Sequence, residues 1–270
     1  MARREAFALV AIPLLVAAIV WLPQAAFLAI LGVVILIAAD ELLAMARAAG
    51  LAVGRWLPLI MVAAVLGLSW SWGALGTAVA AVITVIVMPT IQLLHSRAPE
   101  GGLAGAATTC FTVLYLGLTG ACLGWLRILP ENHLGIRLLL FFLATIWVGD
   151  SGAYYVGSRF GRHRMSPRIS PNKTLEGLAG SVAATFAAAA VSKIAVGLPI
   201  SWGHVAALAA ILAVAAPVGD LVESQFKRDT KVKDSSSLIP GHGGLLDRTD
   251  SLLYAAPPVL AYLLAVGLLR

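Results

Sequence analysis

Long runs of apolar residues, separated by short polar stretches, extend along the chain from end to end. Most of these runs approach the roughly 20 residues that an α-helix needs to cross a membrane. We predict an all-α, polytopic integral membrane protein with about nine transmembrane helices, over residues 7–22, 25–43, 56–70, 73–88, 103–126, 134–148, 175–196, 200–218 and 252–269. No internal repeat or linker divides them, so residues 1–270 are expected to form a single membrane-embedded domain.

The boundary between the first two predicted helices depends on one turn signal. No charged residue interrupts 6–39, which as a single helix would be about 50 Å long against a hydrocarbon core of about 30 Å. Leu22, Pro23 and Gln24 offer a turn. The first apolar run also resembles a signal peptide, but no clear small-residue cleavage site follows it, so we expect a retained helix.

Composition supports a membrane protein and indicates its orientation. The chain is 60% hydrophobic and 12% charged, whereas a soluble domain has roughly 25% charged residues. Fifteen of the 19 Lys and Arg residues fall on one side of the predicted topology, which places the N-terminus and the long loops in the cytoplasm and the C-terminus outside. This bias explains the net charge of +6, so the charge is no evidence for nucleic-acid binding and we expect none.

The polar segment 220–250 contains six of the 13 acidic residues, which orientation in a membrane does not require. Asp220 ends the predicted helix 200–218. If that helix continues, Ser224 and Lys227 follow at helical spacing. A carboxylate with a hydroxyl one turn away suits Mg²⁺, which prefers oxygen ligands. The alternative is an ordinary helix end that extends its charges into water.

The motif "IPGHGG" (239–244) lies shortly before the last predicted helix. Its glycines leave backbone N–H groups free to face an anion. Asp247 and Asp250 follow three residues apart, at a depth where ionisable residues are costly and usually functional. Because Asp220 and Asp247 flank neighbouring spans, they could share a metal ion or a metal pair. A salt-bridge clasp between the two helices is the structural alternative.

A second polar segment, 149–177, contains candidate phosphate-binding groups. Asp150 lies at the exit of the predicted helix 134–148, and Ser170, Lys173 and Thr174 precede the predicted helix 175–196. A helix N-terminus preceded by such donors is suited to binding phosphate. The basic residues of this segment could equally contact anionic lipid headgroups.

These two segments resemble motifs of the phosphatidate cytidylyltransferases, also called CDP-diacylglycerol synthases. The middle motif is similar at Asp150, Ser151, Ala153 and Tyr154 and in "SPNKTLEG" (170–177). The C-terminal signature is similar at Ser224, Phe226, Lys227, Arg228, Lys233, Asp234, Ser236, Ile239, Pro240, His242, Gly243, Gly244, Leu245, Asp247, Arg248, Thr249 and Asp250. Chain length and helix count also resemble those of bacterial members, which implies a bacterial plasma (inner) membrane.

The resemblance implies that CTP and phosphatidate react to give CDP-diacylglycerol and pyrophosphate at the cytoplasmic face. It further implies Mg²⁺, a monovalent cation such as K⁺, contact with anionic membrane lipid, and a homodimer. Three phosphate-bearing groups meet in this reaction, so metal ions and cations are required. Our hypothesis assigns metal ligation to Asp220, Asp247 and Asp250.

The remaining candidate residues are assigned by charge and position. Catalytic roles, chiefly neutralisation of phosphate, are expected for Ser224, Lys227, Arg228, Lys233, His242 and Arg248. We expect His242 to donate a hydrogen bond rather than act as a base, because a phosphate monoester is already largely deprotonated near neutral pH. Substrate binding is expected for Asp150, Ser170, Asn172, Lys173, Thr174, Glu176, Gly243 and Gly244.

Two other classes of function fit parts of the sequence. A polyprenol or phytol kinase that uses CTP, or a cytidylyltransferase for an ether lipid, would share the nucleotide and metal chemistry. The complete C-terminal signature argues against the kinases. An ion-coupled transporter would place charge near the membrane midplane in repeated halves, whereas these charges cluster at one face.

Overall fold

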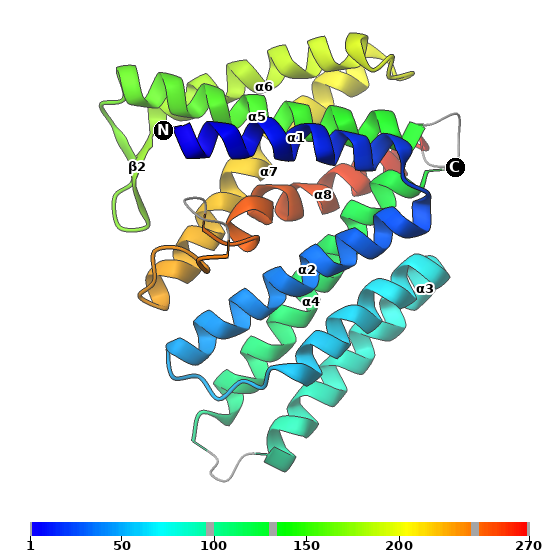
Figure 1. Cartoon of the computed structure of the whole chain (residues 1–270), viewed down its shortest axis with the longest axis vertical. Helices are drawn as coiled ribbons and strands as arrows, with labels where there is room; N and C mark the ends of the chain where they lie inside the picture. The colour runs from blue at the N-terminus through cyan, green and yellow to red at the C-terminus, as the bar shows by residue number, and fades with distance from the viewer. Residues whose placement is uncertain (1, 96–99, 130–133, 239–242, 269–270) are drawn as a thin grey trace. The chain divides into compact units, whose positions relative to one another are not determined.

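The computed structural model describes residues 2–95, 100–129, 134–238 and 243–268. These residues form helices and one two-stranded hairpin (Figure 1). The elements in chain order are α1 (Ala2–Trp21), α2 (Gln24–Ala48), α3 (Trp56–His95), α4 (Gly102–Ile128), α5 (Leu134–Phe160), β1 (Arg164–Ser166), β2 (Ser170–Thr174), α6 (Leu175–Ala195), α7 (Trp202–Asp229) and α8 (Leu246–Ala265). The predicted helical class is confirmed, with a small β-hairpin added.

Within the described residues, six helices, α2 to α7, are long and apolar enough to cross a membrane. A chain with several such helices is a multi-pass membrane protein, because a helix satisfies its own backbone hydrogen bonds within lipid. The total of nine spans stays a prediction.

The chain divides into two compact units, which are described separately. Unit 1 comprises Met1–Gln24, Trp125–Gln225 and Asp250–Arg270. Unit 2 comprises Ala25–Gly124 and Phe226–Thr249. The boundary passes through α7 and α8, so each of these helices contributes to both units.

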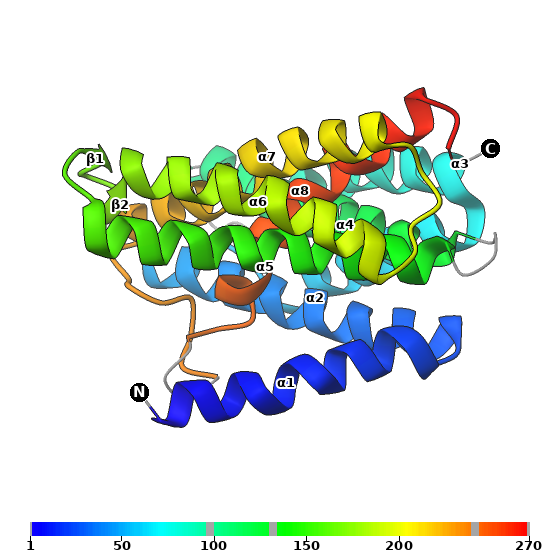
Figure 2. The same cartoon turned by 90° about the horizontal axis from the view of Figure 1, so that it is seen from above.

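In unit 1, α5 and α6 lie side by side (Figures 1 and 2). Small residues allow this close approach: a Cβ added at Gly152 would lie 2.4 Å from the Cβ of Ala184, and one at Gly180 would lie 2.5 Å from the side chain of Val156. This packing continues beyond residue 148, where the sequence predicted the helix to end, and α5 runs to Phe160. Asp150 therefore lies on a helix rather than in a loop, which corrects that expectation.

Helices α7 and α8 are also longer than predicted. The structure extends α7 to Asp229 instead of 218 and begins α8 at Leu246 instead of 252. The added turns are polar, so hydropathy alone does not detect them. The continuation of α7 through Ser224 and Lys227, on which the proposed side-chain alignment depended, is confirmed.

The hairpin of β1 and β2 is antiparallel and was not predicted. The Oε2 atom of Glu176, in the first turn of α6, accepts hydrogen bonds from the backbone N–H groups of Arg162 and His163, at 3.0 and 3.2 Å. Its Oε1 atom lies 2.6 Å from Nδ1 of His163. These contacts hold the chain just before β1 against the start of α6, which brings the two short strands together.

In unit 2, α3 is a helical hairpin that reverses at Gly73, where φ is 60° and ψ is −136°. Oγ1 of Thr77 donates a hydrogen bond to Oγ of Ser69 at 3.0 Å. In a straight helix these residues would be about 12 Å apart along the axis. The two arms match the helices predicted over 56–70 and 73–88, with the second arm continuing to His95.

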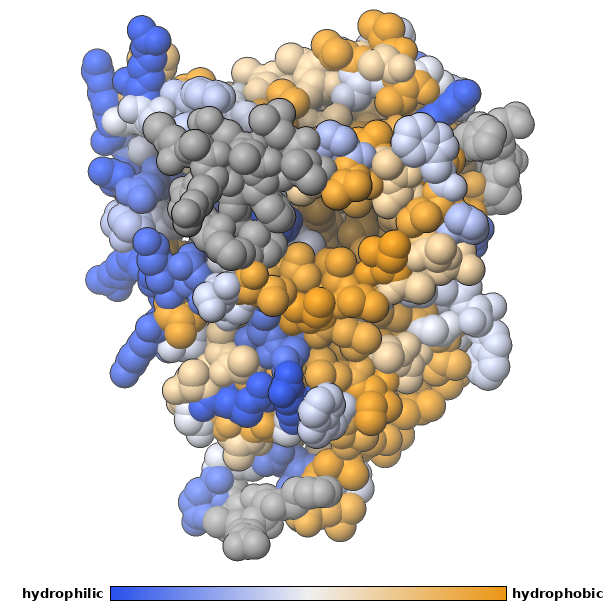
Figure 3. All heavy atoms as spheres, in the orientation of Figure 1, coloured by the Kyte–Doolittle hydropathy of each residue, from blue (hydrophilic) through white to orange (hydrophobic). Residues whose placement is uncertain are grey.

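The core of unit 2 forms where α2, α3 and α4 pack together. A Cβ added at Gly117 would lie 2.9 Å from Val65, and one at Gly120 would lie 2.9 Å from Ile35. Ile35, Val65 and Leu116 are fully buried. Figure 3 shows hydrophobic side chains over the α3 hairpin and hydrophilic ones near the end of α2 and the start of α3.

Candidate active site

Three carboxylates of unit 1 form a compact acidic cluster. Asp220 and Glu223 lie one turn apart on α7, and Asp250 lies on α8. One oxygen atom from each of them falls within 4.8 Å of the others. Glu223 is 2% exposed and Asp250 is 7% exposed. Hard oxygen ligands at this spacing fit Mg²⁺, and a cation offsets the repulsion between buried like charges.

The close approach of α7 and α8 in unit 1 depends on Gly219, the residue before Asp220. A Cβ at this position would lie 2.6 Å from the Cβ of Tyr254 and 3.0 Å from the carbonyl oxygen of Asp250. The absence of a side chain therefore lets the backbone of α8 pass directly beside the acids of α7.

Two predicted site residues contact Asp220. Nζ of Lys173, on β2, lies 2.8 Å from Oδ2 of Asp220. The hydroxyl of Ser224 donates to Oδ1 at 3.3 Å. The structure thus brings the middle motif and the C-terminal signature together at one carboxylate.

Glu223 was not predicted as a ligand, although it belongs to the same cluster. It lies three residues after Asp220, so helical spacing places it on nearly the same face. The helical spacing that points to Ser224 also points to Glu223.

The other predicted substrate-binding residues of this region lie around β2. Ser170 is half-buried and Asn172 is exposed on the strand, whereas Asp150 is exposed on α5. Thr174 is buried and caps α6 by accepting a hydrogen bond from the N–H of Gly177 at 3.1 Å. Thr174 and Glu176 have local structural roles here, and their contact with substrate stays a prediction.

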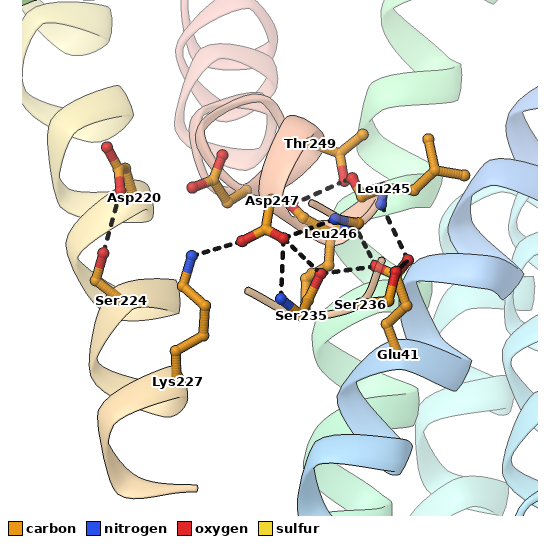
Figure 4. Close-up of polar contacts among 12 residues, drawn as sticks. Glu41, Asp220, Ser224, Lys227, Ser235, Ser236, Leu245, Leu246, Asp247 and Thr249 are labelled. Carbon is orange, nitrogen blue, oxygen red and sulfur yellow. Dashed lines mark hydrogen bonds and ion pairs between the residues drawn. The ribbon is translucent and has the colours of Figure 1, made fainter. Parts of the chain in front are cut away.

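In unit 2, Asp247 lies in the first turn of α8 and is surrounded by donors (Figure 4). Its Oδ1 atom lies 2.5 Å from Nζ of Lys227. Its Oδ2 atom accepts hydrogen bonds from the N–H and hydroxyl of Ser235, at 2.9 and 2.8 Å, and from the N–H of Gly244, at 2.8 Å. Burial alone would raise the pKa of Asp247, but the hydrogen bonds from Lys227, Gly244 and Ser235 outweigh it and lower the pKa to about 2.

Asp247 was predicted to be a metal ligand together with Asp220 and Asp250. The acidic group found among the described residues contains Glu223 in its place. Four hydrogen bonds already engage both oxygens of Asp247. Metal ligation by Asp247 therefore stays a prediction.

A second carboxylate of unit 2, that of Glu41 on α2, binds the same segment (Figure 4). Its Oε1 atom accepts from the hydroxyl of Ser236 at 2.6 Å and the N–H of Leu245 at 3.1 Å. Its Oε2 atom accepts from the hydroxyl of Ser235 at 2.9 Å and the N–H of Leu246 at 2.8 Å. Glu41 was not predicted from the sequence, although an acid within an apolar span is a recognised signal of function.

The two glycines of the signature provide space for these carboxylates. Gly243 has a φ of +77°, and a Cβ there would lie 2.5 Å from Oδ2 of Asp247. A Cβ on Gly244 would lie 2.1 Å from Oγ of Ser235 and 2.3 Å from Oε2 of Glu41. A contact of these glycines with phosphate stays a prediction.

Three of the remaining predicted catalytic residues are basic and lie near the junction of α7 and α8 in sequence. Arg228, Lys233 and Arg248 are exposed, in the last turn of α7, the segment after it and the first turn of α8. His242 lies outside the described residues.

The two units thus provide different chemistry. Unit 1 offers three clustered carboxylates and a lysine, a set suited to holding a divalent cation beside an anionic group. Unit 2 holds its two carboxylates in a dense network of donors at the start of α8.

Comparison with known proteins identifies the family. The model of the Cytidylyltransferase family matches residues 2–266. Similar proteins named phosphatidate cytidylyltransferase include one from Bacillus subtilis (strain 168), 42% identical over 135 residues, which are 50% of each chain. Another, from Brucella suis biovar 1, is 40% identical over 144 residues, 53% of this chain and 52% of the relative.

A third relative of that name, from Staphylococcus epidermidis, is 37% identical over 152 residues, or 56% of each chain. The chain therefore spans about half the length of the curated relatives that it matches. The family model, in contrast, matches the chain over almost all of its length. This chain belongs to the cytidylyltransferase family.

Proposed function

We propose that this protein transfers the cytidylyl group of CTP to phosphatidate, giving CDP-diacylglycerol and pyrophosphate. The observation that carries the proposal is the cluster of Asp220, Glu223 and Asp250, with Lys173 paired to Asp220, in a chain of the cytidylyltransferase family. The names of the similar proteins support phosphatidate as the acceptor.

In this reaction an oxygen of the phosphatidate phosphate forms a bond to the α-phosphorus of CTP. The bond from that phosphorus to the bridging oxygen breaks, and pyrophosphate leaves with its electron pair. The donor set fits Mg²⁺, which Asp220, Glu223 and Asp250 would hold and which supplies positive charge to the phosphates. The K⁺ that the family resemblance implies is part of the proposal, as is metal ligation by Asp247.

The cationic side chains neutralise the remaining negative charge. Lys173 is within reach of a phosphate bound at the cluster, because it already pairs with Asp220. Lys227 must share its Nζ between Asp247 and a phosphate. The further residues proposed to contact substrate or the reacting groups are Asp150, Ser170, Asn172, Thr174, Glu176, Ser224, Arg228, Lys233, His242, Gly243, Gly244 and Arg248.

The proposal places this chemistry at the cytoplasmic face of a bacterial inner membrane. CTP arrives from water and phosphatidate from the lipid leaflet, so the reacting groups must lie at headgroup level. The distribution of Lys and Arg supports cytoplasmic polar segments. Nine spans, with the C-terminus outside, and a homodimer complete the proposal.

Pyrophosphate release by purified protein in detergent, with Mg²⁺ and CTP, tests the function. Release is expected only when phosphatidate is also present, and it should depend on whether K⁺ or Na⁺ is supplied. Asp250→Asn is expected to abolish release, whereas Asp229→Asn, which changes an exposed carboxylate at the end of α7, should not.

Three results would redirect the assignment. CDP formation from a lipid alcohol, without pyrophosphate, identifies a CTP-dependent kinase. Pyrophosphate release with an ether analogue but not with a diacyl phosphatidate identifies an ether-lipid cytidylyltransferase. A folded protein that releases neither pyrophosphate nor CDP with any lipid contradicts the enzymatic proposal and favours the transporter.

A further inference from the structure

Glu41 is a buried carboxylate that the proposed chemistry does not use. It lies on α2 and is 6% exposed. Among the described residues, its hydrogen-bond donors are two serine hydroxyls and two backbone N–H groups rather than Lys or Arg. Burying a carboxylate is costly unless its oxygens are satisfied, so an arrangement with donors around both oxygens indicates a specific role.

The first contribution of Glu41 is to the start of α8. The first N–H groups of a helix have no acceptor within the helix. Glu41 accepts those of Leu245 and Leu246, at 3.1 and 2.8 Å, although it lies more than 200 residues earlier in the chain. Asp247 accepts the N–H of Gly244 at 2.8 Å. A carboxylate at a helix N-terminus also interacts favourably with the helix dipole.

The second contribution passes through Ser235. Its hydroxyl lies 2.9 Å from Oε2 of Glu41 and 2.8 Å from Oδ2 of Asp247. Because a hydroxyl has one proton, the two carboxylates share this single donor. The N–H of Ser235 also donates to Asp247, at 2.9 Å. The position of Ser235, and with it the orientation of the Asp247 carboxylate, therefore depends on Glu41 (Figure 4).

We propose that Glu41 is a positioning residue for the cytidylyltransferase site. It fixes the N-terminus of α8 and, through Ser235, the carboxylate of Asp247. Asp250 lies three residues further along the same helix, so α8 carries this acid also. Glu41 itself touches neither substrate nor metal. The catalytic part of this inference rests on the proposed function.

Glu41→Gln removes the charge with little change in size. Its amide NH₂ must face one of the two donor pairs, so the backbone N–H of that pair loses its acceptor and the serine hydroxyl of that pair must accept instead of donate. The matched control is Asp40→Asn, in the preceding residue of α2. Asp40 binds Arg55 at 2.8 and 2.7 Å and contributes none of the contacts at the start of α8 described above.

Two measurements on the full-length protein test the proposal. In the pyrophosphate assay, Glu41→Gln is expected to lower kcat and to raise the Mg²⁺ concentration that gives half the maximal rate. The ratio of kcat to this concentration should fall by about 10- to 100-fold. The KM for phosphatidate should change little. Hydrogen exchange, which needs no activity, should become faster in peptides covering 243–250. Asp40→Asn should leave both measurements unchanged.

The outcomes separate the positioning role from a purely structural one. Faster exchange in Glu41→Gln with unchanged kcat and Mg²⁺ dependence overturns the positioning role. Unchanged exchange overturns the proposed cap on α8. If the wild-type protein releases no pyrophosphate, the proposed function fails, but the exchange result still decides the cap.

A second variant covers the case in which Glu41→Gln does not fold. Ser235→Ala removes the hydroxyl that links the two carboxylates and leaves the contacts of Glu41 with Leu245 and Leu246 in place. It should also lower kcat and raise the Mg²⁺ requirement. If Ser235→Ala folds and has the kcat and the Mg²⁺ requirement of the wild-type protein, the proposal is overturned.

Discussion

Nζ of Lys173, on β2, lies 2.8 Å from Oδ2 of Asp220, on α7. This ion pair connects the two polar segments that the sequence singled out separately, one for phosphate and one for metal. The side chain of Lys173 is 23% exposed and that of Asp220 is 42% exposed. Because such pairs at a partly open surface contribute little to stability, we infer that the pair's main importance is to place a cation beside the acidic cluster.

Lys173→Met is therefore expected to impair activity more than stability. Loss of a cation that stabilises phosphate charge should lower kcat/KM for CTP by roughly 100-fold. Lys173→Arg should recover part of this loss, because it restores the charge with different geometry. Steady-state pyrophosphate release and thermal unfolding in detergent provide the two readouts. The control is Lys231→Gln, at an exposed position. If Lys173→Met is as active as this control, Lys173 does not belong to the active site.

Gly219→Ala tests whether close packing of α7 and α8 is needed at the acidic cluster. The new Cβ would lie 2.6 Å from that of Tyr254, so the helices must separate, at a cost of about 1–3 kcal/mol. We expect a lower unfolding temperature and a higher Mg²⁺ requirement for pyrophosphate release. Gly203→Ala is the control on the same helix, because its nearest contact would be 3.7 Å away, at Ser201. Equal effects of the two substitutions would contradict this explanation.

Much of the fold was predictable because membrane helices are long apolar runs. The start of α6 at Leu175 and the turn at Gly73 agree with the sequence. The extensions of α5 and α7 were not predictable from hydropathy, because their last turns are polar and are stabilised by packing rather than by lipid. The β-hairpin depends on Glu176 contacting residues more than ten positions earlier.

The acidic cluster could be predicted in part. Asp220 and Asp250 were identified because charge at the end of a membrane helix is unusual. The distinction between Asp247, which is bonded to Lys227, and Asp250, which lies in the cluster, requires the tertiary structure. Glu41 was missed because its partners are about 200 positions away and no local motif surrounds it.

Glu176→Gln tests the contact that holds the β-hairpin. A glutamine has no charge, and it can keep the contacts with the N–H groups of Arg162 and His163 and with the His163 ring only if its NH₂ donates to an unprotonated Nδ1, so these hydrogen bonds become weaker. We expect faster trypsin cleavage between residues 162 and 168 under native conditions, because the segment opens more often. Glu100→Gln, at an exposed position, is the control. A cleavage rate equal to wild type would show that strand pairing alone holds the hairpin.

Gly73→Ala tests the reversal of α3 independently of activity. A φ of 60° with a ψ of −136° is accessible almost only to glycine, and a residue with a side chain there costs about 1–3 kcal/mol. No heavy atom lies within 4 Å of the added Cβ, so backbone strain is the only expected effect. Gly67→Ala, in the first arm, also meets no atom within 4 Å and should stabilise the helix by up to about 1 kcal/mol. Thermal unfolding in detergent should therefore shift in opposite directions for the two variants. If the unfolding temperatures of both variants shift in the same direction, Gly73 does not reverse the chain in the way described.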